Sequence, residues 1–199
     1  MKLKGIRIGF AITGSYCTIR EALGQISRLV ECGADVYPII SSSVDSSDTR
    51  FGSSEEWKEA LRKITGHDII RTIVEAEPIG PNKLFDIMIV APCTGNTVAK
   101  LANAITDSPV LMAIKAHLRN QRAVVLAIST NDGLGMNAKN IGLLLNTKNI
   151  YMVPFGQDNP AVKANSLVAK MSLLADTVLN AIEGRQIQPV LIQYTATSH

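Results

Sequence analysis

The feature that most constrains the fold is the stretch from Phe85 to Pro109, where a buried type of strand leads into a polar loop and then a helix. The run Asp86–Ala91 (DIMIVA) is nearly all apolar, which is typical of a parallel strand covered by helices on both faces. The loop Pro92–Thr97 (PCTGNT) follows at the carboxyl end of that strand. Because ligands bind at such strand ends in open α/β sheets, the stretch predicts a fold class and a place for a site.

The polar loop itself has two interpretations. Free backbone N–H groups and short hydroxyls at a helix N-terminus suit an anion or a flat polar ring. The same residues also fit an ordinary strand-to-helix turn, with Thr94 or Asn96 as the helix cap. A further helix is predicted from Pro109 to about His117, because a proline suits the first turn of a helix. We expect His117 to lie on the surface.

The alternation of strand, polar loop and helix recurs along the chain. Other strands are predicted at Ile6–Ile12, Asp35–Ile40, Ala123–Ile128 and Ile150–Pro154, and Pro38 places the second of these at an edge. Five or six strands, with no sustained hairpin signal and no repeat, predict an α/β fold. We expect a three-layer α/β/α sandwich around a mostly parallel, Rossmann/flavodoxin-like sheet.

One domain is the expectation for 199 residues. Apolar residues at helical spacing predict a long helix from about Val162 to Glu183, ended by Gly184. We therefore assign residues 1–184 to the α/β domain and residues 185–199 to a C-terminal tail. The single tryptophan, Trp57, is expected to be a packing residue.

Composition excludes several classes of function. The net charge is +3 and no long basic run occurs, which argues against nucleic acid as a main partner. No apolar run approaches the roughly 20 residues that span a bilayer, so we expect a cytoplasmic protein without membrane contact. Cys17, Cys32 and Cys93 are scattered, and their spacing predicts neither a disulfide framework nor a metal site. Cys17 and Cys93 fall at the predicted ligand edge, where a small buried thiol is the simpler account.

Four polar loops follow predicted strands, namely Thr13–Ser15, Ser41–Ser43, Ala91–Thr97 and Ser129–Asn137. In a parallel sheet these loops share one edge. Their convergence predicts a site for a planar ligand that carries a phosphate.

Four blocks, in order, resemble the homo-oligomeric flavin-binding cysteine decarboxylases. Thr13–Ser15 (TGS) resembles their GSxA loop, and Ala91–Thr97 (APCTGNT) resembles their P-x-S-A-N-T motif. Lys100–Asp107 (KLANAITD) resembles their K-x-A-N-G-x-x-D segment, and Ser129–Met136 lies where they carry a substrate-clamping loop. The resemblance implies a flavoprotein-like domain, bound FMN, and assembly into trimers or dodecamers with the flavin at a subunit interface.

The resemblance also implies site residues. Those expected around the flavin or its phosphate are Gly14, Ser15, Ser41, Thr94, Asn96, Thr97, Asp107 and Ser108. Those expected near the substrate are Lys115, Asn131, Gly133, Met136 and Asn137. No catalytic residue is assigned, because the decarboxylases carry a histidine shortly before the central strand where this chain has Glu77–Pro81, and Gly95 replaces the alanine of their motif. Decarboxylation of a thiol-containing substrate by FMN is therefore the alternative.

Longer segments resemble one component of a two-component oxidoreductase of spore-forming bacilli, and this resemblance covers nearly the whole chain. The segments are Glu77–Pro92, Ala102–Gln121, Val125–Asn137 and Lys148–Pro160. The resemblance implies oxidation of a dihydrodipicolinate-type precursor to dipicolinate in the cytoplasm of a sporulating mother cell. It also implies a dehydrogenase-like A subunit as partner, with the NADP chemistry there.

Aromatisation of such a ring removes two hydrogens, and a flavin is a plausible acceptor for them. The two carboxylates of the substrate need cationic or N–H partners. The candidates are Lys100, Lys115 and Lys139, with the backbone N–H groups of Gly133 and Gly135. A non-catalytic partner of the A subunit, which keeps the fold without binding flavin, is the third hypothesis.

Overall fold

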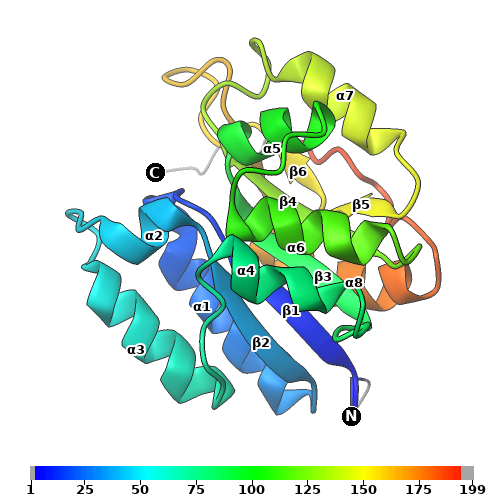
Figure 1. The fold of residues 1–199 in the computed structure, drawn as a ribbon. Coiled ribbons are helices and arrows are strands. Elements are labelled where there is room, and N and C mark those ends of the chain that lie inside the picture. Colours follow the sequence, from blue (N-terminus) through cyan, green and yellow to red (C-terminus); the bar gives the residue numbers. More distant parts are fainter. Residues whose placement is uncertain (1–2, 194–199) are drawn as a thin grey trace.

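A single mixed sheet lies at the centre of the computed structural model, which describes residues 3–193 (Figure 1). Seven strands form it within these residues, in the order β2-β1-β3-β4-β7-β6, with β5 paired to β4. The parallel strands are β1 (Arg7–Ile12), β2 (Asp35–Ile40), β3 (Ile87–Cys93), β4 (Val124–Thr130) and β5 (Ile150–Met152). The antiparallel strands are β6 (Phe155–Gly156) and β7 (Leu167–Ala169). The predicted α/β fold with a mostly parallel sheet is confirmed, and β2 lies at the end of the strand order, as Pro38 indicates. The sheet has seven strands instead of the predicted five or six, because the short antiparallel strands β6 and β7 extend it beyond β4.

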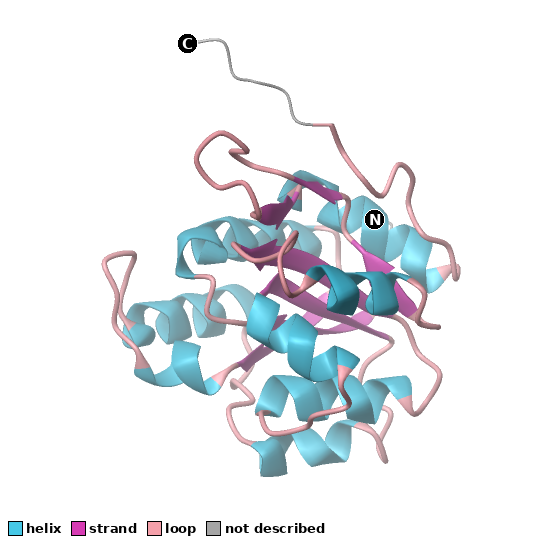
Figure 2. Cartoon of the chain, turned by 90° about the horizontal axis from the view of Figure 1, so that it is seen from above, coloured by secondary structure: helices cyan, strands magenta, loops and turns pink. Residues whose placement is uncertain are grey.

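Helices cover both faces of the sheet (Figure 2). One layer contains α1 (Tyr16–Glu31), α3 (Ser54–Thr65) and α8 (Leu174–Ile182). The other contains α4 (Ile73–Ala76), α5 (Gly95–Ala102), α6 (Pro109–Leu118) and α7 (Ala138–Leu145). The shorter pieces are α2 (Ser42–Ser46) and the 3-10 turns η1 (Glu77–Ile79) and η2 (Met171–Leu173). All seven residues of β3 are buried between these layers, which explains its continuous apolar sequence.

Side-chain caps place the two helices that follow the central strand. The Thr94 hydroxyl accepts the N–H of Thr97 at the start of α5. The Ser108 hydroxyl accepts the N–H of Leu111 at the start of α6, where Pro109 is the first helical residue. Both caps agree with the sequence, because short oxygen-bearing side chains satisfy the free N–H groups of a first turn.

The prediction of a long helix from Val162 to Glu183 is wrong for the first half of that range. Leu167–Ala169 forms β7 instead, and α8 begins only at Leu174. The backbone of β7 pairs with the end of β4, with Thr130 opposite Leu167. This pairing across the sheet overrides the helical spacing of the apolar residues, which continues only through η2 and α8.

His117 is also placed differently from the prediction. Its side chain is 1% exposed, and Nε2 lies 3.1 Å from the carbonyl oxygen of Ala123. Burial lowers the pKa of His117 to about 4, so the ring is neutral at pH 7. Trp57 is buried in the core, as expected.

The described part of the tail runs along the edge formed by β5 and β6. The Gln186 side chain donates to the carbonyl of Met152 and accepts its N–H, both at 2.7 Å. The backbone N–H of Ile192 donates to the carbonyl of Phe155 at 3.0 Å. Residues 194–199 of the predicted tail lie outside the described residues.

Candidate functional site

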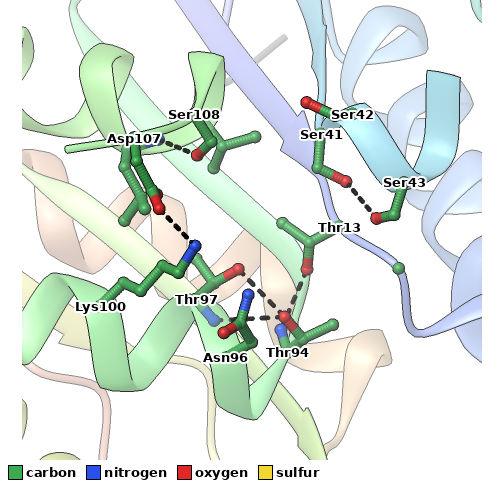
Figure 3. A pocket seen from close by; sticks show the side chains of 13 residues that line it. Thr13, Ser41, Ser42, Ser43, Thr94, Asn96, Thr97, Lys100, Asp107 and Ser108 are labelled. Atoms are coloured by element: carbon green, nitrogen blue, oxygen red, sulfur yellow. Dashed lines mark hydrogen bonds and ion pairs between the residues drawn. The ribbon is translucent and has the colours of Figure 1, made fainter. Parts of the chain in front are cut away.

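The loops after β1, β2 and β3 meet at the carboxyl edge of the sheet and enclose a cavity of about 360 Å³ (Figure 3). We call it the edge cavity. Its lining is Thr13, Gly14, Ser41, Ser42, Ser43, Thr94, Asn96, Thr97, Lys100, Asp107, Ser108, Val110 and Leu111. Hydroxyls, amides and one ion pair dominate this set, so the cavity suits a polar or anionic ligand.

Thr13 joins the loops that follow β1 and β3. Its hydroxyl donates to the carbonyl of Pro92 at 2.7 Å and accepts the N–H of Thr94 at 3.0 Å. The side chain is 2% exposed, so both hydrogen bonds are shielded from water. This contact fixes the two loops relative to each other before any ligand binds.

The N-terminus of α5 faces the cavity. Thr94 caps the helix, and its hydroxyl also lies 3.0 Å from that of Thr97. The cap satisfies only some of the N–H groups in the first turn, which includes Gly95 and Asn96. The remaining N–H groups and the helix dipole favour an anion at this end.

One ion pair closes the far side of the cavity. Lys100 Nζ lies 2.6 Å from Asp107 Oδ2, and these residues come from α5 and from the turn before α6. Across the cavity, the hydroxyls of Ser41 and Ser43 lie 2.9 Å apart (Figure 3). The cavity therefore offers a ligand hydroxyl and N–H donors, together with the remaining donors of the Lys100 ammonium.

Two glycines allow the loops at this edge to pack closely. A Cβ at Gly14 would lie 2.9 Å from the hydroxyl of Ser43. A Cβ at Gly95 would lie 2.4 Å from the hydroxyl of Thr130 and 2.8 Å from the amide nitrogen of Asn137. Only a residue without a side chain allows these close approaches. The chemistry of the lining is what fits a flavin nucleotide, because hydroxyls and the N-terminus of α5 suit a phosphate or the polar edge of a ring.

A second cavity of about 290 Å³ lies beside the first and shares Gly14 and Thr94 with it. We call it the hydroxyl cavity. Its lining is Gly14, Ser15, Cys17, Thr18, Thr94, Gly95, Ser129, Thr130, Asn131, Asp158, Lys163, Ser166 and Val168. The Ser15 and Ser129 hydroxyls lie 2.7 Å apart and connect the loops after β1 and β4. All four predicted loops therefore meet at one edge.

The structure brings together most of the predicted flavin residues. Seven of the eight line the edge cavity, and Ser15 lines the hydroxyl cavity. The predicted substrate residues are dispersed. Asn131 lines the hydroxyl cavity, whereas Gly133 lines an apolar groove beside α7. Met136 is 74% exposed and the Asn137 amide donates to Asp132, while Lys115 lines neither cavity.

Lys163 and Asp158 are site residues that the sequence did not indicate. Both lie between β6 and β7, in a segment assigned partly to the predicted long helix. Of the cysteines at this edge, Cys17 is exposed and Cys93 is buried. Burial raises the pKa of the Cys93 thiol to about 12, so this side chain is a packing group.

Neither described histidine belongs to these cavities. His67 Nε2 lies 2.6 Å from Asp35 Oδ1 at the start of β2, and His117 is buried beside Ala123. Within residues 3–193, no three His, Cys, Asp or Glu side chains gather as metal ligands. None of the described helices combines the length and apolar character that a membrane span requires.

The comparisons with known proteins agree with this geometry. A family model described as Flavoprotein matches residues 1–184. The dipicolinate synthase B subunit of Bacillus subtilis (strain 168) is 53% identical over 96% of both chains. The crystal structure of the dipicolinate synthase B subunit from Bacillus halodurans is also 53% identical, with a TM-score of 0.90 over 98% of this chain and 100% of that one.

A more distant structure shows the same fold. Burkholderia xenovorans DmrB, solved in complex with FMN, is 16% identical over 87% of this chain and 93% of its own, with a TM-score of 0.66. The family model and the two high-identity relatives cover nearly the full length of the chain. The chain therefore belongs to the flavoprotein family and, within it, to the family of dipicolinate synthase B subunits.

Proposed function

We propose that this chain provides an FMN site for the oxidation of a dihydrodipicolinate-type precursor to dipicolinate. The observation that carries the proposal is the edge cavity of about 360 Å³, which hydroxyls and the N-terminus of α5 surround. The family match and the FMN complex of DmrB support the choice of cofactor. When bound, FMN would supply an acceptor for the two electrons that aromatisation releases.

The proposed flavin contacts are Gly14, Ser15, Ser41, Thr94, Asn96, Thr97, Asp107 and Ser108. In this arrangement the first turn of α5 and the nearby hydroxyls bind the phosphate or the polar edge of the ring. The buried Thr13 holds the two loops in place. The chain's own groups therefore bind and orient the cofactor, and no residue is assigned as proton acceptor.

The proposal includes a partner and an assembly. The high-identity relatives are B subunits of dipicolinate synthase, so we infer an A subunit as partner, and we place the NADP chemistry there. We also propose a homo-oligomer, a trimer or a dodecamer; the cubic cage that DmrB forms supports assembly of this fold in general. The complex would act in the cytoplasm of the sporulating mother cell.

The decarboxylase alternative is weaker. The cysteine decarboxylases that the chain resembles carry a catalytic histidine, and neither described histidine lines the edge cavity or the hydroxyl cavity. The third hypothesis, a partner that binds no flavin, leaves the edge cavity with its polar lining without a role.

The test is electron transfer to bound FMN. The full chain, loaded with FMN and mixed with the A subunit, receives the dihydrodipicolinate-type precursor without NADP and without oxygen. The proposal predicts loss of the oxidised flavin absorbance and formation of dipicolinate in equal amounts. A flavin that stays oxidised under these conditions, while the same complex forms dipicolinate once NADP is added, would contradict it.

A further inference from the structure

The hydroxyl cavity resembles the edge cavity in its hydroxyls and its lysine–aspartate pair, but mostly other segments form it. The loops after β1 and β4 supply the hydroxyls of Ser15, Ser129 and Thr130, and the segment between β6 and β7 supplies Lys163. At about 290 Å³ its volume lies just below that of typical ligand sites, which span roughly 300–1,000 Å³. Such a volume has room for one small ring with polar substituents.

Lys163 supplies the positive charge of this cavity. Its Nζ lies 3.4 Å from Asp158 Oδ2, and an ammonium carries three donors, so this contact leaves two of them for a ligand. Of the lysines predicted to bind the substrate, Lys100 lines the edge cavity and makes the shorter pair, 2.6 Å to Asp107, whereas Lys115 and Lys139 line neither cavity.

The segment that carries Lys163 is held in position. The Gln157 side chain donates to the carbonyl of Ala164 at 2.8 Å, across the base of the segment. The N–H of Leu134 donates to the carbonyl of Asn165 at 3.0 Å, which joins the segment to the loop after β4. Ser166 at its end is 1% exposed. The lysine therefore extends from a structured wall of the cavity.

We propose that the hydroxyl cavity binds a pyridine-dicarboxylate type of ligand, with the Lys163 ammonium as the partner of one carboxylate. The hydroxyls of Ser15, Ser129 and Thr130 supply neutral donors for the rest of the ligand. A charge-assisted hydrogen bond from an ammonium to a carboxylate is stronger than a neutral one, which makes Lys163 the anchor. As the substrate site, this inference rests on the proposed function, because Gly14 and Thr94 form a wall common to both cavities.

The Asp158 carboxylate limits how tightly this cavity binds an anion. Although partial burial opposes ionisation, the Ser166 hydroxyl and the Lys163 ammonium hold the pKa of Asp158 below its ordinary value. The carboxylate therefore stays charged at pH 7 and repels an anionic ligand while it orients the lysine. Removal of this charge should tighten the binding of a dicarboxylate.

The experiment is a calorimetric titration of the full chain with dipicolinate as probe, with FMN present, and both with and without the A subunit. Lys163→Met should weaken dipicolinate binding by at least about ten-fold, whereas Lys163→Arg should stay within about three-fold of the wild type. Asp158→Asn should bind more tightly. Lys139→Met, on the exposed surface of α7, is the matched control and should be unchanged.

Two further measurements separate this inference from the proposed function. The neutral probe pyridine-2,6-dicarboxamide should bind alike to the wild type and to Lys163→Met. FMN affinity should also be equal in both. The inference is overturned if dipicolinate does not bind, or if it binds equally to the wild type and to Lys163→Met, even when FMN binds. An equal loss of FMN affinity in Lys163→Met also overturns it, because the cavity would then belong to the cofactor. Lysine-dependent dipicolinate binding without any FMN binding would support the inference and contradict the proposed flavin site.

Discussion

The two ends of the sheet are both polar, but they are built differently. At the amino end, Arg7 Nη2 lies 3.0 Å from Asp86 Oδ1, and the backbone N–H of Arg7 also donates to Asp86. His67 and Tyr37 both bond Asp35, at 2.6 and 2.8 Å, and their rings stack with centroids 4.0 Å apart. Each of these charged groups has a partner of opposite charge or a hydrogen bond within the fold.

The carboxyl end also contains paired polar groups, such as Lys100 with Asp107 and Ser15 with Ser129, but it encloses two cavities that hydroxyls and the N-terminus of α5 line. Its two cavities meet at Gly14 and Thr94. Polar residues at strand ends therefore do not by themselves make a site. The amino end uses its polar groups on one another and so stabilises the sheet, whereas the carboxyl end keeps donors and space for a ligand.

The largest effect that would separate the two ends is expected at Gly14. In Gly14→Val the new Cβ would lie 2.9 Å from the Ser43 hydroxyl, so the added side chain would displace Ser43 in the wall of the edge cavity. We expect FMN affinity to fall by about 100-fold, roughly the loss of one or two charge-assisted hydrogen bonds. Fluorescence titration with FMN measures it. Gly24→Val is the control, because a Cβ at Gly24 meets no atom within 4 Å. Equal affinity in the two variants would show that Gly14 does not border the flavin.

A change at the amino end should lower the stability of the fold and leave FMN affinity unchanged. Asp86→Ala removes the acceptor of Arg7 and leaves two guanidinium groups, those of Arg7 and Arg122, without their carboxylate. Because the pairs are partly exposed, we expect the free energy of unfolding to fall by only about 1–2 kcal/mol, with FMN affinity unchanged. Urea unfolding measures the free energy of unfolding of Asp86→Ala, and Asp68→Ala, which removes an exposed carboxylate, is the control. A loss of FMN affinity with no loss of stability would reverse the roles of the two ends.

A further effect, confined to acid pH, is a pH dependence from His117, which packs near the amino end. Its pKa is about 4 in the folded chain against an ordinary 6.5, so the unfolded chain binds the proton more readily between these values. Stability from the neutral ring is complete above pH 6.5 and is lost as the pH falls toward 4, by up to about 1.4 kcal/mol per pH unit. In His117→Leu this part of the slope should vanish. Identical slopes for variant and wild type in urea unfolding would contradict the buried neutral ring.

Local signals explain what could be predicted from the sequence. The apolar run of β3 and the caps Thr94 and Ser108 depend on neighbouring residues, and the structure has them where the sequence indicates. The convergence of the loops follows from parallel topology alone.

The errors arise where distant contacts decide the outcome. Leu167–Ala169 has helical spacing but pairs with β4, and this pairing brings Lys163 to the hydroxyl cavity. His117 is polar and near a helix end, yet a carbonyl of the segment before β4 gives it a buried partner. The neighbouring residues in the sequence give no sign of these distant contacts, so the positions of Lys163 and His117 could not be predicted from the sequence.

The first measurement to make on the flavin site is the absorbance spectrum of the purified full chain after incubation with FMN and desalting, with and without the A subunit. We predict a retained flavin band in the wild type and its loss in Gly14→Val, with Asp86→Ala still coloured at a temperature where it remains folded. A wild-type chain that stays colourless in both preparations would contradict the assignment of the carboxyl edge of this sheet as a flavin site.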